Sequence, residues 1–109
     1  MSPSLECLEN QYFTLRSSLP TLVTQGATTD QIDQLKAAIA KSRDNYWLAT
    51  RRILHDDDPA VGSLVSQMNT EQLSLDATIK HLGDIAGVIN AITKAVDIGS
   101  QLAAKAVTL

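Results

Sequence analysis

The fold is decided by residues 82–107, which read LGDIAGVINAITKAVDIGSQLAAKAV. Apolar and small residues in this stretch alternate three and four positions apart, the spacing of a helix that packs lengthwise on a partner. Glycine or alanine also recurs at every fourth position, and such a ladder of small residues lets two helix backbones approach closely. Because the polar residues occupy less than half the circumference, we predict a helix that is buried on more than one side. These polar residues form one strip: Asn90, Lys94, Asp97, Gln101 and Lys105.

The small-residue ladder predicts an interface with a protein partner or with a second copy of the chain. Three glycines lower the helix propensity of this stretch by about 2–3 kcal/mol relative to alanine. A sequence retains such a penalty most readily where another backbone must come close, although close packing inside the chain's own bundle is the alternative use of this spacing. The candidate interface residues are Gly83, Gly87, Ala91, Ile92, Ala95, Gly99 and Ala103.

A first helix is predicted at the beginning of the chain. Ser2 and Pro3 are a natural cap and first-turn residue, and we expect the helix to end at Pro20. Residues 21–28 are then a connector with Gly26 as its break. The predicted apolar stripe of this helix is Leu5, Leu8, Tyr12, Leu15 and Leu19.

The second helix has the most regular pattern in the chain. Thr28 and Gln31 form a capping box at its start, and the three–four spacing continues without a slip as far as Ile53. Asp58 and Pro59 are the expected cap and first residue of a third helical segment.

The third segment has two possible courses. Asn69 and Gln72 form another capping-box signature, so we expect a short helix to about Met68, then either a kink or a continuous run to about Val107. A straight helix over residues 70–107 would be about 57 Å long at 1.5 Å per residue. One end would project beyond the other helices and would need cover from another molecule.

The predicted fold is a single all-α domain over residues 1–109. We expect an antiparallel bundle or helical hairpin of about three helices, with coiled-coil-like packing and a long C-terminal helix rich in alanine and glycine. Because only 4% of residues are aromatic, the predicted core is aliphatic.

Charge and composition limit the function classes. The net charge is −3, and no basic cluster exceeds the pair Arg51 and Arg52, which argues against nucleic-acid binding. The single cysteine, Cys7, excludes an internal disulfide and fits a reducing compartment. No secretory signal opens the chain, and the apolar run at residues 85–93 is too short to span a bilayer. We therefore expect a soluble, cytoplasmic protein.

Candidate catalytic and metal-binding residues are few. His55 precedes three aspartates at residues 56–58, but adjacent ligands lack metal-site spacing, and a capped turn is the favoured interpretation. His81 and Asp84 lie three apart with no nucleophile to serve, which indicates a surface pair. Acidic neighbours raise the pKa expected for Cys7, the wrong direction for a nucleophile. Without a phosphate loop or catalytic motif, we expect no catalysis, cofactor, metal or small-molecule substrate.

A second candidate interface lies in the second helix. Tyr46 and Trp47 are adjacent, and Arg43 and Arg51 lie four residues to either side of Trp47. These residue types dominate binding hot spots, whereas the competing interpretation is a tryptophan at the core's edge covered by an arginine stem.

The sequence thus predicts a non-enzymatic helical interaction module that acts through its C-terminal helix as a homo-oligomer, such as a homodimer. An adaptor, a regulator or an immunity-type sequestering protein fits this description. In size and helical plan the chain is similar to small regulators such as immunity proteins and antiactivators, a likeness that transfers no residue. The alternative is a membrane-active, pore-forming or membrane-associating protein that uses the same helix, although Lys94 and Asp97 count against insertion.

Overall fold

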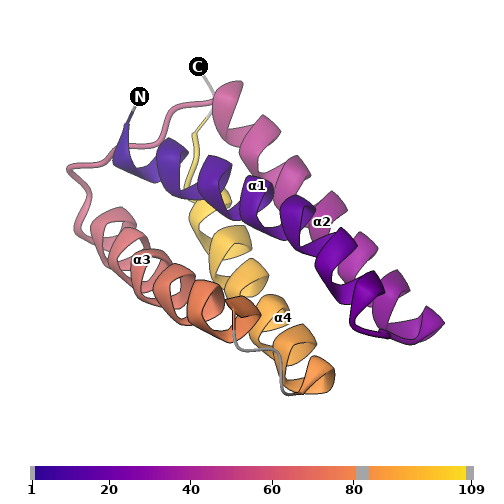
Figure 1. Ribbon diagram of the computed structural model, residues 1–109. Coiled ribbons are helices and arrows are strands. Elements are labelled where there is room, and N and C mark those ends of the chain that lie inside the picture. Colours follow the sequence, from indigo (N-terminus) through magenta and orange to yellow (C-terminus); the bar gives the residue numbers. More distant parts are fainter. Residues whose placement is uncertain (1, 81–83, 108–109) are drawn as a thin grey trace.

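Four helices make up most of residues 2–80 and 84–107, which the computed structural model describes (Figure 1). Within these ranges the only β-type pairing is an isolated antiparallel bridge between Ile53 and Val107. The predicted all-α class is confirmed, whereas the predicted number of about three helices is wrong. The helices are α1 (Pro3–Thr24), α2 (Thr29–Thr50), α3 (Pro59–Lys80) and α4 (Ile85–Ala103).

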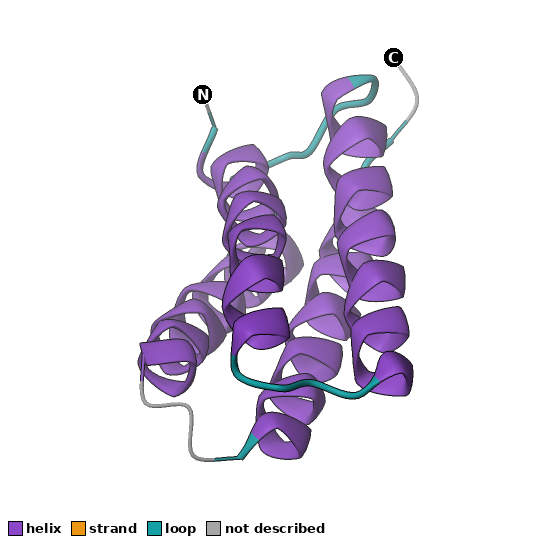
Figure 2. Ribbon diagram, turned by 45° about the vertical axis from the view of Figure 1, so that its right-hand side comes forward, coloured by secondary structure: helices purple, strands orange, loops and turns teal. Residues whose placement is uncertain are grey.

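Consecutive helices run antiparallel, so that the chain passes up and down the bundle (Figures 1 and 2). α1 packs against α2 and α3, and α4 packs against the same two helices. α1 and α4 lie diagonally opposite each other and share a smaller contact. The connection from α2 to α3 crosses the end of the bundle diagonally. There Ile53 and Val107 exchange backbone hydrogen bonds of 2.9 and 2.8 Å, which fasten the end of the described chain to this connection.

The prediction that the first helix ends at Pro20 is wrong. α1 continues through Pro20 to Thr24, whose hydroxyl donates to the Pro20 carbonyl at 2.8 Å. Burial of Leu22, which is 0% exposed, holds this last turn in place in spite of the amide N–H that proline lacks. The connector is therefore shorter than residues 21–28, and its break is Gly26, at a φ of 90° that favours glycine.

The start of α2 is confirmed as a capping box. The Gln31 amide donates to the Thr28 hydroxyl at 3.1 Å, and the Thr28 amide donates to the Gln31 side chain at 2.9 Å. α2 ends at Thr50, so the apolar spacing that reaches Ile53 extends beyond the helix. The next helix begins at Pro59 as predicted.

The long C-terminal helix is the main correction. α3 is a continuous helix through Asn69 and Gln72, so the expected short helix to Met68 is wrong, and so is the run from residue 70 to Val107. α4 has 19 residues and the other helices have 22 each, so no helix projects far beyond its partners.

α4 begins after Asp84, which has an extended backbone and accepts the Val88 amide through its carbonyl at 3.1 Å. Lys80 in the last turn of α3 and Asp84 at the N-cap of α4 both carry the charge that suits the adjacent helix dipole. A basic residue followed closely by an acidic one is what the end of one helix and the start of the next predict, so these charges indicate the separation of α3 from α4 that the apolar spacing does not reveal.

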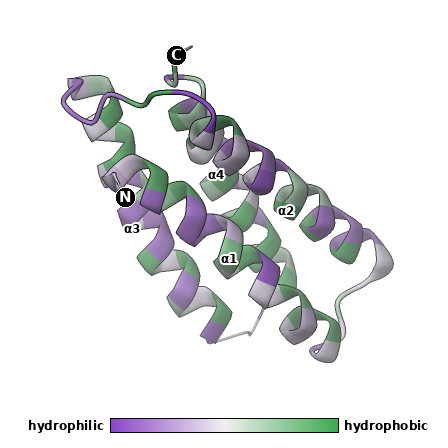
Figure 3. Ribbon diagram, turned by 90° about the horizontal axis from the view of Figure 1, so that it is seen from above, coloured by the Kyte–Doolittle hydropathy of each residue, from purple (hydrophilic) through white to green (hydrophobic). Residues whose placement is uncertain are grey.

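The interior consists of two aliphatic clusters, to which all four helices contribute. Stripes of hydrophobic and hydrophilic residues along the helices are visible in Figure 3. The fully buried members include no aromatic residue, as the composition predicts. The first core contains Leu8, Ala49, Val61, Leu64, Met68, Ile98, Leu102 and Ala103. The second core contains Leu15, Leu22, Leu35, Leu75, Val88, Ile89, Ile92 and Val96.

Candidate functional site

The seven candidate residues of the C-terminal helix are divided by the structure. Gly83 lies outside the described residues, and Gly87 and Ala91 are half-buried on α4. The atoms nearest to an added Cβ at Gly87 belong to the side chain of Asp84, the first at 3.0 Å, so the closest neighbour there lies in the preceding turn. The other four are buried within the bundle, and a partner would reach them only if the helices separated: Ile92, Ala95, Gly99 and Ala103.

Gln11 explains the glycine at position 99 of α4. Its side chain is 3% exposed and donates to the Ala95 carbonyl at 2.7 Å. An added Cβ at Gly99 would lie 2.5 Å from the Gln11 Oε1 atom, so glycine leaves the space that this carboxamide occupies. At Gly99 the ladder therefore accommodates a polar side chain of α1.

Gln11 belongs to a polar layer that separates the two cores. In α1 it lies between Leu8 of the first core and Leu15 of the second. Asn45 donates to the Ser100 hydroxyl at 3.1 Å across the α2–α4 contact, and Gln72 donates to the Thr14 hydroxyl at 2.7 Å across the α1–α3 contact. We expect these part-buried polar bonds between helices to favour one register of the bundle.

A second group of side chains lies on the outer surface of α1 and α2. The chain has four aromatic residues, all on these two helices, and none is buried. Phe13 is 43% exposed and Trp47 is 51% exposed, and two arginines lie over the rings. We call this surface the aromatic face; it consists of Tyr12, Phe13 and Arg16 from α1 and Arg43, Tyr46 and Trp47 from α2.

Stacked guanidinium groups organise the aromatic face. The Arg16 Cζ atom lies 5.5 Å from the Tyr12 ring centroid and 5.2 Å from that of Phe13. These two rings are 5.4 Å apart, so one arginine covers a pair of aromatic rings. The Arg43 Cζ atom lies 5.0 Å from the Trp47 ring centroid. Each cation–π contact at an exposed site contributes about 0.5–1 kcal/mol and holds the arginine in place.

Tyr46 connects the two helices of the aromatic face. Its hydroxyl donates to the Glu9 carboxylate at 2.8 Å. This hydrogen bond raises the pKa of Tyr46, with smaller contributions from desolvation and from the negative charge of Glu9. The Glu9 carboxylate of α1 is therefore engaged by the Tyr46 hydroxyl of α2.

The structure brings together three of the four residues of the second candidate interface. Arg43, Tyr46 and Trp47 share the aromatic face, whereas Arg51 is exposed at the C-cap of α2 and makes no cation–π contact with Trp47. Sequence reasoning missed Tyr12, Phe13 and Arg16. Their spacing was the available signal, because residues three and four apart on a helix lie on one face.

The aspartates near His55 act as helix caps. Asp56 accepts the Ser4 amide of α1 at 3.0 Å, and Asp58 accepts the Ala60 amide of α3 at 2.8 Å. Across residues 2–80 and 84–107, no three metal-ligating side chains cluster together. His81 lies outside the described residues.

Cys7 is half-buried between α1 and α3. Its thiol donates to the Asn69 side chain at 3.2 Å. Burial raises the pKa of this thiol, and the charges of Glu6 and Asp56 raise it further. The thiol is therefore a structural hydrogen-bond donor with little thiolate character.

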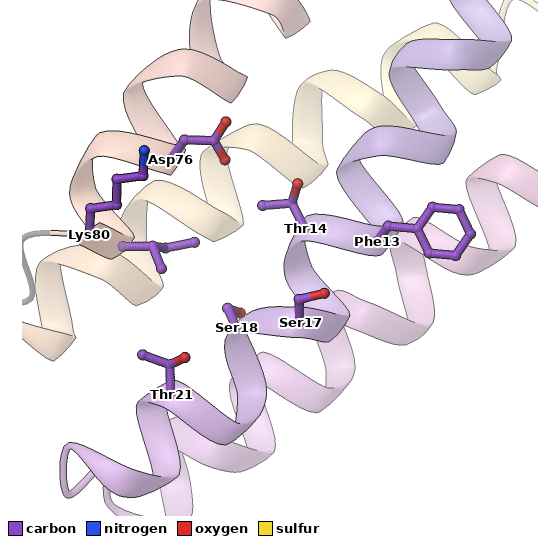
Figure 4. A pocket seen from close by; sticks show the side chains of 8 residues that line it. Phe13, Thr14, Ser17, Ser18, Thr21, Asp76 and Lys80 are labelled. Carbon is purple, nitrogen blue, oxygen red and sulfur yellow. The ribbon is translucent and has the colours of Figure 1, made fainter.

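An open surface groove of about 390 Å³ lies between α1 and α3. Thr14 and Ser17 of α1 and Asp76 and Lys80 of α3 line its two walls, while the ring of Phe13 points away from α3 (Figure 4). Thr14 already accepts a hydrogen bond from Gln72. Among the described lining residues, no hydroxyl of the groove donates a hydrogen bond to Asp76.

Comparisons with protein-family models, curated proteins and solved structures find no match to this chain. No helix among the described residues is both long enough and apolar enough to cross a membrane.

Proposed function

We propose that the protein is a non-enzymatic helical interaction module that binds a protein partner through the aromatic face of α1 and α2. The observation that carries this proposal is that every aromatic residue of the chain lies on the neighbouring helices α1 and α2 and none is buried, with arginines over three of the four rings. An adaptor or a regulator that sequesters its partner would act in this way.

Three of the four aromatic side chains are poorly explained by the stability of the bundle. The buried residues of the two cores are aliphatic, and Tyr46 is the one aromatic residue that packs against them. Trp47 keeps 51% of its surface exposed, although burial of a tryptophan is strongly favourable in water. Tryptophan, tyrosine and arginine are the residues most enriched at the hot spots of protein interfaces. Truncation of one hot-spot residue costs about 2 kcal/mol or more, which corresponds to about a thirtyfold loss of affinity.

The C-terminal helix has a supporting role in this proposal. α4 packs against α2 and α3 and accepts the hydrogen bond of Gln11 from α1, so it supports the helices that carry the aromatic face. Gly87 and Ala91 are half-buried, and Ala91 packs against the second core, so only part of the predicted ladder is open to a partner. Self-association through either surface would give the homo-oligomer that the sequence predicts.

The test is capture of the partner by the tagged chain in its native cells, with Trp47→Ser compared against the wild type. We expect Trp47→Ser to lower recovery of the partner at least about tenfold, because serine removes the largest exposed ring. Leu73→Ser is the matched control, since Leu73 is 73% exposed on α3, away from the aromatic face. Loss of the partner with Leu73→Ser but not with Trp47→Ser would contradict the proposal.

A second candidate function is membrane activity through α4. The observation in its favour is that nine residues of α4 are buried beneath the other helices, as in a bundle that shelters an apolar helix. α4 would have to leave the bundle to meet lipid. Release of dye from vesicles of anionic phospholipid at micromolar protein would support this candidate, and intact vesicles would exclude it under those conditions.

A further inference from the structure

One apolar stripe runs through the sequence of both α3 and α4. From Leu75 to Val96 a series of large apolar residues recurs at intervals of three and four, with no slip where α3 ends and α4 begins. No proline follows Pro59, so the sequence between α3 and α4 is compatible with a helix. The described members of the stripe all belong to the second core or pack against it. The stripe consists of Leu75, Ile79, Leu82, Ile85, Ile89, Ile92 and Val96.

The start of α4 differs from the starts of the other three helices. Ser2, Thr28 and Asp58 each accept a backbone amide through the side chain, which caps α1, α2 and α3. Asp84 has the same position at α4, but among the described residues its side chain caps no backbone amide. Only residues 81–83 lie between the end of α3 and Asp84. A short connection between packed helices favours the exchange of a helix between two copies of a chain.

The contact between α3 and α4 can be repeated between two copies. In the monomer these helices lie antiparallel and side by side (Figures 1 and 2), and a salt bridge of 3.2 Å joins Glu71 to Lys94. If α3 and α4 formed one straight helix, the stripe would lie along a single face of it. Two such helices can pack antiparallel, with α3 of one copy beside α4 of the other. Nine residues of α4 are buried in the monomer, so a straight helix requires a second copy to cover them.

We propose that the chain forms a dimer by exchange of α4 with a second copy, in which α3 and α4 join into one helix over residues 59–103. This helix is about 65–70 Å long at 1.5 Å per residue, whereas the longest extent of the monomer is 43 Å. Gly83 lies in the interior of this helix, where glycine is unfavourable, so the monomer is favoured at low concentration.

The dimer contains two bundles of the kind that the monomer forms. Each bundle combines α1, α2 and α3 of one copy with α4 of the other, so the contacts of α4 with its neighbours become contacts between chains. The aromatic face belongs to α1 and α2 and is therefore present once in each bundle. The inference goes beyond the proposed function and does not depend on it, because the exchange uses no residue of the aromatic face.

Sedimentation after refolding measures the dimer. Refolding from urea at high concentration brings copies together before α4 has packed on its own chain. We expect a dimer after refolding at about 1 mM, and a monomer after refolding at about 1 μM, because association follows mass action. A chain that is monomeric after refolding at both concentrations would overturn the inference.

Crosslinking identifies which copy supplies α4 to each bundle. Isotope-labelled and unlabelled chains are refolded together, the dimer is isolated, and a carbodiimide joins the Glu71 carboxylate to the Lys94 amine. Mass spectrometry of the digest should find about half of these links between a labelled and an unlabelled chain, because every link of an exchanged dimer joins two copies. In a dimer without exchange each link stays within one chain, and that result would overturn the inference.

A proline at the start of α4 separates the two forms. Ile85 is the first residue of α4 and follows the extended backbone of Asp84, a position that proline accepts. Within a continuous helix the same proline lacks an amide N–H and clashes with the preceding turn. Ile85→Pro should therefore lower the dimerisation constant at least about a hundredfold. Ile85→Ala is the matched control for lost packing and should change it less than about threefold, because this packing is lost equally in both forms.

Asp84→Ala tests the opposite direction. The Asp84 side chain is exposed, and alanine is a better helix former than aspartate, so this substitution should raise the dimerisation constant at least about threefold. Circular dichroism verifies that each variant is helical. If Ile85→Pro does not fold, Asp84→Ala and the crosslinks decide. Equal dimerisation of Ile85→Pro and the wild type, or no increase with Asp84→Ala, would overturn the inference.

Discussion

The carboxamide of Gln11 fills the space that Gly99 leaves open in α4. Its Nε2 atom is held by the Ala95 carbonyl at 2.7 Å, which fixes the Oε1 atom toward Gly99. Oε1 is buried without a hydrogen-bond partner, so this contact has little freedom to adjust. The crossing of α1 and α4 therefore depends on a pair of residues, one polar and one without a side chain.

Gly99→Ala should lower the free energy of unfolding by about 1–3 kcal/mol, because its Cβ would collide with Gln11 and overpack the interior. Urea denaturation followed by circular dichroism measures the change. Gly62→Ala is the matched control: no atom lies within 4 Å of an added Cβ there, and the better helix propensity of alanine should stabilise α3 by about 0.5–1 kcal/mol.

A double-mutant cycle separates the collision from other effects. In a Gln11→Ala background the colliding atom is gone, and Gly99→Ala should be neutral or stabilising. A destabilisation of the same size in both backgrounds would show that Gln11 is not the reason for the glycine.

Pro20→Ala should raise the free energy of unfolding by about 1–3 kcal/mol, because alanine restores a backbone hydrogen bond in the interior of α1. Thermal and urea denaturation measure this change. Ser17→Ala, at another exposed position of α1, should alter stability by about 0.5 kcal/mol or less. A loss of stability with Pro20→Ala would mean that the proline stabilises α1 by restricting the unfolded chain.

Several features of the bundle follow from sequence spacing, and particular residues show why others do not. The capping box of Thr28 and Gln31 is local, so its geometry is contained in four adjacent positions. The end of α3 at Lys80 is hidden from the apolar spacing because Ile79, Leu82 and Ile85 follow one another at intervals of three in the sequence. Periodicity records the face that a helix buries and does not record where the chain reverses.

Burial of polar residues is the second limit. The predicted stripe of α1 included Tyr12 and Leu19, yet the residues buried beside the leucines are Gln11 and Ser18. Their partners are carbonyls, Ala95 of α4 for Gln11 and Leu15 for Ser18, and the first is 84 positions distant along the chain. A pattern of apolar residues cannot predict a buried amide whose acceptor is so remote. Because Gln11 takes the buried position, Tyr12 is only half-buried and becomes part of the aromatic face.

Asp56→Ala should lower the free energy of unfolding by about 0.5–2 kcal/mol, since the Ser4 amide in the first turn of α1 would lose its acceptor. Asp57→Ala is the control, because its exposed side chain caps neither helix. Equal effects of the two substitutions would contradict the capping role.

His55→Ala combined with a chelator should leave the melting temperature nearly unchanged, because the neighbouring aspartates are occupied as caps. Differential scanning calorimetry with and without chelator measures this. If the chelator lowered the melting temperature by several degrees, a stability loss of about 1 kcal/mol or more, a bound structural metal would be indicated.

The hydrogen bond between Tyr46 and Glu9 should make the free energy of unfolding fall as the pH rises into the alkaline range. Because the pKa of Tyr46 is raised in the folded state, the native protein keeps this proton when the unfolded chain, with a tyrosine pKa of about 10, has lost it. The stabilisation is therefore complete below pH of about 10 and is lost as the pH rises through the folded-state value. Urea denaturation at pH of about 9 and about 11 should show a larger loss for the wild type than for Tyr46→Phe. Glu9→Gln, which keeps an acceptor without the charge, should lie between them, and identical losses in all three would mean that the bond does not form in solution.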